Sequence, residues 1–306
     1  MMTISLPLRA KVLTTVATTA LAGVVALGAP GIATAAAQSP VRSEVSENWA
    51  GYVVTGKNFS SVSGGWREPT VKASSSSSET YSAVWVGLGG YRTSTSSLEQ
   101  VGASADYVDG HAEYYAWYEL LPSAQVRLNI AIHPGDKISA RVSVTGTTVT
   151  VSLSDQTTGR SVVKTLHMSQ PDTSSAEWIV EAPATEAFGG NYQVLPLADF
   201  AKVAFSEATA TAGGYEGGIS SAHWSATRIQ LRTPSGFAST SGPALVSVGP
   251  PAGSQQSGEA TTSTLSAGTF SVSWRLSSAT QATSGSQPAV SQYPAPGPFP
   301  TATGIP

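Results

Sequence analysis

The chain has 306 residues, no cysteine, 11% charged residues and a formal net charge of −3. Globular domains usually carry about 25% charged residues, so this protein is unusually poor in charge. The mild acidity and the lack of a basic run argue against a nucleic-acid partner, and the absence of cysteine excludes thiolate catalysis, zinc–thiolate sites and disulfides.

The first 37 residues predict a secretory signal peptide. Arg9 and Lys11 supply positive charge, residues 12–29 are almost wholly small or apolar, and residues 33–37 offer small-residue cleavage sites. A permanent transmembrane anchor is the alternative, but the apolar stretch is short and interrupted by Gly and Pro. We therefore expect a secreted, extracellular protein without membrane association after cleavage, and a short N-terminal arm at residues 38–46.

The rest of the chain shows the period of two that is typical of strands. Short runs of β-branched and aromatic residues lie between clusters of Gly, Ser, Pro and Asn. The predicted strands are 48–55, 81–87, 111–120, 138–144, 147–153, 161–166, 177–180, 203–207, 228–231, 244–248 and 269–276. Many short strands indicate an all-β antiparallel sandwich or barrel, which we place at residues 47–277.

Two segments add detail to this organisation. In 147–153 the residues Val149, Val151 and Leu153 alternate with Ser and Thr, which predicts a half-exposed strand. Residues 278–306 are rich in Ser, Thr and Gln and then in Pro, a composition that predicts a disordered tail.

Several familiar catalytic motifs do not occur in the sequence. There is no G-x-S-x-G elbow, no H-E-x-x-H, no P-loop and no dinucleotide-binding glycine pattern. The histidines at 111, 133, 167 and 223 share no metal-ligand spacing, so we expect no metal, no cofactor and no catalytic role for them.

Six short strings follow one another in a fixed order. They are Asn48-Trp49-Ala50-Gly51-Tyr52, Gly65-Trp66-Arg67-Glu68-Pro69, Ser82-Ala83-Val84-Trp85-Val86-Gly87-Leu88-Gly89-Gly90, Leu98-Glu99-Gln100-Val101-Gly102, Tyr115-Ala116-Trp117-Tyr118-Glu119 and Ala176-Glu177-Trp178-Ile179-Val180-Glu181. Together they resemble the glutamic peptidases, or eqolisins, over roughly residues 46–277. The chain departs from this family in lacking cysteine and in having Tyr115 where Asp is common.

The resemblance implies a sandwich of two antiparallel sheets, of the concanavalin or jelly-roll kind. It also implies a secreted endopeptidase that acts on polypeptides, needs no cofactor, resists pepstatin and works as a monomer. The catalytic glutamine of the family falls on Gln100, and its catalytic glutamate falls on Glu177.

The chemistry of this pair suits peptide hydrolysis under acid conditions. An ionised Glu177 can take a proton from water and later return it to the leaving amine. The Gln100 amide can donate to the developing oxyanion while its carbonyl orients the water. Neither role needs an imidazole, which is protonated in acid. The alternative is that both residues are solvated strand residues.

Six further residues are candidates for substrate binding. Three are tryptophans of the strings, which could line a peptide cleft or simply supply core area, as could Trp178. The strand 111–119 carries polar and aromatic residues on both faces, as expected beside a groove. The six candidates are Trp49, Trp85, Asp106, Trp117, Tyr118 and Glu181.

Three classes of function remain open at this point. The first is the acid endopeptidase, the second a sandwich glycosidase with two carboxylates about 5–9 Å apart, and the third a carbohydrate-binding module that uses tryptophan platforms.

Removal of residues 1–37 takes away two of the 16 basic residues and none of the 19 acidic ones. Because few ion pairs can be lost in acid, we expect a folded, active protein near about pH 3. We expect its activity to fall towards neutrality because the leaving amine needs a proton, not because the protein unfolds.

Overall fold

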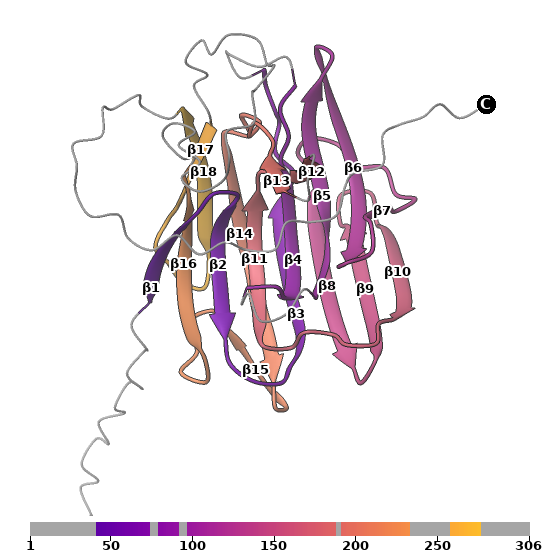
Figure 1. The fold of residues 1–306 in the computed structure, drawn as a ribbon, viewed down its shortest axis with the longest axis vertical. Helices are drawn as coiled ribbons and strands as arrows, with labels where there is room; N and C mark the ends of the chain where they lie inside the picture. The colour runs from indigo at the N-terminus through magenta and orange to yellow at the C-terminus, as the bar shows by residue number, and fades with distance from the viewer. Residues whose placement is uncertain (1–40, 74–78, 92–96, 188–190, 233–257, 277–306) are drawn as a thin grey trace, which may run out of the picture. The chain divides into compact units, whose positions relative to one another are not determined.

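The computed structural model describes residues 41–73, 79–91, 97–187, 191–232 and 258–276, which all belong to one compact unit (Figure 1). Within these ranges the chain forms strands and no helix, and hence no helix able to cross a membrane. The strands are β1 (Arg42–Ser46), β2 (Trp49–Thr55), β3 (Phe59–Arg67), β4 (Ala83–Gly89), β5 (Leu98–Val108), β6 (His111–Leu120), β7 (Val126–Arg127), β8 (Lys137–Thr145), β9 (Thr148–Asp155), β10 (Arg160–His167), β11 (Ser175–Glu181), β12 (Ala184–Ala187), β13 (Asn191–Val194), β14 (Lys202–Ala212), β15 (Tyr215–Gly218), β16 (Ser225–Leu231), β17 (Gly258–Thr262) and β18 (Phe270–Leu276).

Sixteen of these strands form one hydrogen-bonded sheet. Its order is β10-β9-β8-β3-β14-β18-β17-β16-β2-β11-β4-β5-β6-β7, with β1 added to β16 and β15 added to β14. All pairings are antiparallel except that of β1 with β16, and β12 and β13 form a separate hairpin.

The sheet folds back on itself to make two layers. We call β16, β2, β11, β4, β5, β6 and β7 the front layer, and β10, β9, β8, β3, β14 and β18 the back layer. The rings of Tyr52 in β2 and Phe270 in β18 meet edge to face at 4.8 Å. The Trp178 indole in β11 donates to the Ser63 carbonyl of β3 at 2.7 Å. The predicted sandwich is confirmed, with the refinement that β17 pairs with both β18 and β16 and so joins the layers.

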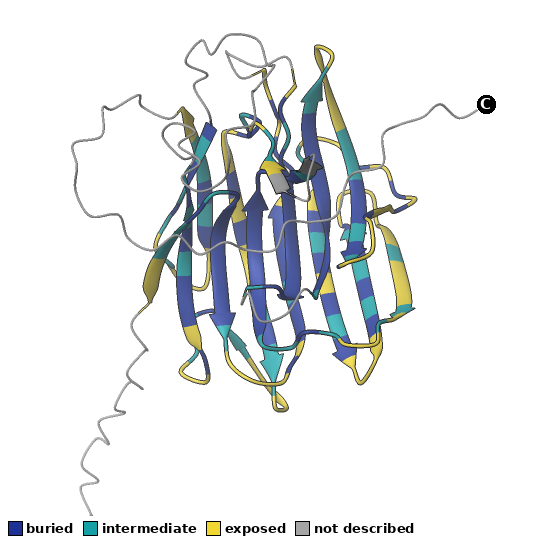
Figure 2. Ribbon diagram, viewed as in Figure 1, coloured by how far each residue is buried: buried dark blue, intermediate teal, exposed yellow. Residues whose placement is uncertain are grey.

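The two layers differ in how they bury their residues (Figure 2). In β9 of the back layer Val149, Val151 and Leu153 are buried in the core while the residues between them are partly exposed, which confirms the predicted alternation. In β4 and β11 of the front layer every residue is buried. The front layer therefore has a second buried face, turned away from the back layer, which we call the site face.

Most predicted strands are present; β3 is among those not predicted, and the longest omission is β5. Its sequence is rich in Gly, Ala, Ser and Asp, which have low strand propensity. Pairing on both edges with β4 and β6 overrides that propensity. Residues 42–46 of the expected arm form β1 in the sheet. The predicted signal peptide, the strand 244–248 and the tail 278–306 lie outside the described residues.

Candidate active site

A single cross-strand row brings the two predicted catalytic residues onto one face. Glu177 of β11 pairs with Gly87 of β4, Gly87 pairs with Gln100 of β5, and Gln100 pairs with Glu119 of β6. Directly paired residues project to the same side of a sheet, so all four belong to the site face. We call these four residues the central row. Since two strand spacings separate Glu177 from Gln100, their Cα atoms lie about 10 Å apart.

Gly87 leaves space between the two predicted catalytic side chains, Glu177 and Gln100. A Cβ atom at this position would lie 2.8 Å from Cζ3 of Trp85 and 3.1 Å from the Glu99 carbonyl oxygen. A larger residue would therefore displace the Trp85 ring and fill the gap across which Glu177 and Gln100 face each other.

Glu177 is completely buried. Burial raises the pKa of its carboxyl group well above the ordinary value, because desolvation disfavours the charged form, and the acids Asp172 and Glu99 add to the rise. The neighbouring Ser175 hydroxyl opposes this rise in part. Neither carboxyl oxygen accepts a hydrogen bond of ordinary geometry from a described residue. Buried polar atoms without partners are rare and are typical of functional sites.

Gln100 is held from the side opposite Glu177. Its Nε2 donates to Oε2 of Glu119 over 2.7 Å, and both side chains are buried. The second Nε2 hydrogen is available for another acceptor. Oε1 of Gln100 has no hydrogen-bond donor among the described residues. Glu119 thus fixes the amide plane, a role that the sequence analysis did not assign to it.

The tryptophans of the site face form a packed floor and not an exposed surface. Trp49, Trp85 and Trp117 are buried, and the rings of Trp49 and Trp85 meet edge to face at 5.0 Å. The Trp85 indole donates to Oε2 of Glu181 at 2.8 Å. This arrangement positions the neighbours of the central row, which agrees with the alternative that these rings supply buried area.

Two of the predicted acids also lie on the site face. Glu181 accepts from Asn48 at 3.1 Å as well as from Trp85, and burial raises its pKa to about 7 although these donors oppose the rise. Asp106 accepts from the Ser82 amide and from the Tyr115 hydroxyl, and burial raises its pKa to about 7. Both acids support the floor through hydrogen bonds.

Tyr118 is the predicted substrate-binding residue that the structure places elsewhere. It packs against the core between the layers, as its position next to Trp117 on the strand requires, and Trp178 does the same. The four histidines lie outside the central row; His223, for example, stacks on Tyr215 at 3.6 Å.

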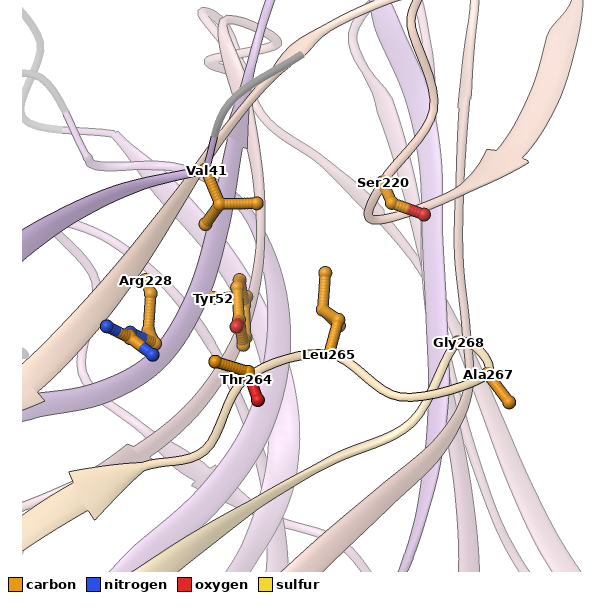
Figure 3. Close-up of a pocket in the computed structure, with 8 residues that line it drawn as sticks. All are labelled: Val41, Tyr52, Ser220, Arg228, Thr264, Leu265, Ala267 and Gly268. Atoms are coloured by element: carbon orange, nitrogen blue, oxygen red, sulfur yellow. The ribbon is translucent and has the colours of Figure 1, made fainter. Parts of the chain in front are cut away.

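A pocket of about 440 Å³ is lined by no residue of the central row (Figure 3). Its wall includes Tyr52 and Arg228, which are paired residues of β2 and β16. Tyr52 packs into the core, so these two residues project to the side of β2 and β16 that is opposite the site face. It is lined by Val41, Tyr52, Ser220, Arg228, Thr264, Leu265, Ala267 and Gly268.

The comparison with known families decides between the open functions. The family model described as the Peptidase A4 family matches residues 47–248. The chain belongs to the Peptidase A4 family. The resemblance to the glutamic peptidases is thereby confirmed, and the chain is a glutamic-type endopeptidase. The glycosidase and the carbohydrate-binding module are set aside.

Individual relatives agree with this assignment. The chain is 34% identical over 201 residues to aspergillopepsin-2 of Aspergillus niger, covering 58% of this chain and 69% of that protein. It is 29% identical over 177 residues to scytalidopepsin B of Scytalidium lignicola, covering 56% of this chain and 65% of that protein.

The fold agrees with solved structures of the same family. Scytalido-glutamic peptidase with a transition state analog inhibitor superposes with a TM-score of 0.58 at 26% identity, over 75% of this chain and 98% of that one. Its complex with a peptide-based transition state analog gives the same TM-score at 25% identity and the same coverage. The expected all-β sandwich is therefore that of the family.

Proposed function

We propose that Glu177 and Gln100 are the catalytic pair of this endopeptidase and that it acts on polypeptides in acid. The observation that carries the proposal is the central row, in which both side chains are buried on one face across a glycine. The unpartnered oxygens of Glu177 and of Gln100 on this face are acceptors for the hydrogens of an attacking water.

The raised pKa of Glu177 refines the expected mechanism. The chemistry expected from the sequence starts from an ionised carboxylate, whereas burial favours the protonated form of this group. A neutral carboxyl group can act at both oxygens: one accepts the proton of the attacking water while the other donates to the substrate carbonyl oxygen. In the second step the same group protonates the leaving amine and takes a hydroxyl proton from the tetrahedral intermediate. The carboxyl group thus ends each step protonated.

Gln100 acts without changing its protonation. With one Nε2 hydrogen on Glu119, the other can donate to the oxygen of the tetrahedral intermediate, and Oε1 can hold the water. Because Glu119 and the surrounding strands fix the amide, little reorganisation is needed when charge develops on the substrate.

We also propose that the enzyme is secreted and monomeric. The signal-like segment 1–37 supports secretion, and we expect a monomer that has no membrane association once this segment is removed. Size-exclusion chromatography with light scattering of the secreted protein tests the monomer, and N-terminal sequencing tests the cleavage site.

Two substitutions test the catalytic pair. Glu177→Gln removes both proton transfers and should abolish cleavage of a quenched peptide at about pH 4. Gln100→Ala removes the oxyanion donor and should lower the rate by about 10²–10³-fold. Glu216→Gln changes an exposed acid in β15 and serves as the matched control, with activity unchanged. Circular dichroism confirms the fold of each variant, and wild-type activity should persist with pepstatin. A folded Glu177→Gln protein with near wild-type activity would falsify the assignment.

A further inference from the structure

The short strand β7 brings a cation to the edge of the site face. Arg127 pairs with Trp117 of β6, so its side chain projects to the same side as Trp117. Trp117 in turn pairs with Gly102, two residues along β5 from Gln100. Arg127 therefore lies on the face that carries the central row, two strands away from Gln100.

A ring on the neighbouring strand holds this guanidinium in place. Cζ of Arg127 lies 3.8 Å from the centroid of the Tyr115 ring, within the range of a cation–π contact. The Tyr115 hydroxyl donates to Oδ2 of Asp106 at 3.0 Å, and Asp106 is itself buried and accepts from the Ser82 amide. Asp106 thus holds the Tyr115 ring in place, and the ring in turn holds the guanidinium group of Arg127.

The donors of Arg127 remain available. The side chain is exposed, and it makes no hydrogen bond or ion pair with any residue in the described part of the chain. An arginine fork binds a carboxylate through two parallel hydrogen bonds, and a fork that is already oriented loses less side-chain entropy on binding. A cation that is oriented and that makes no ion pair among the described residues is suited to an anionic ligand.

We propose that Arg127, stacked on Tyr115, forms a subsite for an acidic side chain of the substrate. This subsite rests on the proposed function of the central row. Two strand spacings are about 10 Å, and an extended peptide advances about 3.3 Å per residue. The acidic residue therefore lies within about three residues of the scissile bond.

The surrounding acids leave Arg127 available in the working range. The titratable groups on the same face of the neighbouring strands are Asp106 of β5 and Glu113, Tyr115 and Glu119 of β6, and Glu119 is bonded to Nε2 of Gln100. Burial raises the pKa of Asp106 to about 7, so this group is neutral in acid and does not compete for the guanidinium. Glu113 is exposed and lies opposite Asp106 in the pairing of β5 with β6. A substrate glutamate ionises near pH 4.3, so the subsite should distinguish Glu from Gln above that pH and not below it.

Matched peptides test the subsite. A set of quenched peptides carries Glu at each of the three positions on either side of the scissile bond, and a second set carries Gln. The wild type should hydrolyse one or two of the Glu peptides with a kcat/KM about fivefold above that of the Gln partner at pH 5, which is the upper range for an exposed ion pair. At pH 3 the ratio should fall to about one.

The variants separate this role from a structural one. Arg127→Gln should bring the ratio to about one at both pH values while leaving hydrolysis of the Gln peptides unchanged. Tyr115→Ala removes the platform and should lower the ratio. Arg160→Gln, at an exposed site in β10 of the back layer, is the control and should keep the wild-type ratio.

Each outcome has a defined meaning. A ratio near one for every peptide in the wild type at pH 5, or a wild-type ratio in Arg127→Gln, overturns the subsite. Full activity of Glu177→Gln contradicts the proposed catalytic pair, and the Glu-to-Gln ratio then still decides the subsite on its own. Failure of the wild type to cleave any peptide contradicts both.

Discussion

The strands of the two layers have the same geometry but differ in which of their sides are buried. In the back layer, β9 buries one side in the core and leaves Ser and Thr on the other. In the front layer, β11 buries both sides, and its second side carries Glu177 and Glu181. Fully buried acids are rare because desolvation of the charged form is costly. The back layer thus stabilises the fold, whereas the site face carries buried acids that lower stability when they ionise.

The largest expected effect is the response of stability to pH, to which buried acids of the site face and of the rest of the sandwich contribute. Burial raises the pKa of Glu68 and Glu99 to about 8 and that of Asp106 and Glu181 to about 7. In the unfolded chain these groups ionise near pH 4. Stability is therefore complete below about pH 4 and is lost as the pH rises to about 8, because the unfolded chain releases its protons first. We expect the free energy of unfolding to fall by several kcal/mol.

Urea denaturation at about pH 4, 6 and 8 measures this fall. Glu99→Gln should flatten the dependence, and the exposed Glu216→Gln should not. Equal unfolding free energies at pH 4 and pH 8 would rule out the destabilisation. This prediction departs from the expectation from the sequence, which attributed the loss of activity towards neutrality to the proton needed by the leaving amine and not to unfolding.

In the back layer, a core truncation should affect stability alone. Leu153 is fully buried in β9, so Leu153→Ala leaves a cavity and should cost about 2–5 kcal/mol. The neighbouring Ser152→Ala, on the other side of the strand, is the control and should cost little. Below the melting transition, kcat/KM of Leu153→Ala should equal that of the wild type. A large drop in kcat/KM for the folded variant would show that the back layer also shapes the site.

In the front layer, the addition of a single methyl group at Gly87 should lower activity. Gly87→Ala places a methyl group 2.8 Å from the Trp85 ring, between Glu177 and Gln100. Displacement of either group by about 1 Å can cost about 10²-fold, and we expect a loss of that size. Gly218→Ala is the control, because its Cβ would meet only the Ala208 carbonyl oxygen at 3.7 Å. Peptidase kinetics of both variants and the wild type at about pH 4 test this prediction. Equal rates for Gly87→Ala and Gly218→Ala would show that the space at Gly87 is not needed.

The smallest expected effect concerns the positioning of Gln100. Glu119→Gln replaces one of the two carboxyl oxygens with an NH2 group, so the 2.7 Å contact with Nε2 of Gln100 is kept in only one orientation of the new amide. We expect kcat to fall about tenfold with KM nearly unchanged. Glu113→Gln, exposed on the same strand, should leave both parameters unchanged. A rise in KM with kcat intact would point to substrate binding instead.

The sequence by itself determined most of the strand content and predicted the catalytic pair. Alternation such as that of Val149, Val151 and Leu153 follows from the local period of a strand, and this strand is present as predicted. The ordered strings placed Gln100 and Glu177 in segments that the family comparison then matched. These features depend on neighbours along the chain or on short motifs, so the chain alone contains them.

Only the tertiary structure decided what surrounds that pair. The register of β11, β4, β5 and β6 aligns Glu177, Gly87, Gln100 and Glu119, although β11 follows β6 by more than 50 residues in the chain. It also turns Tyr118 into the core and brings Arg127 onto Tyr115. Which side of a sheet a residue occupies depends on pairing between distant strands, and a shift by one residue would reverse it. For that reason the supporting residues of the site emerge only once the layers are folded together.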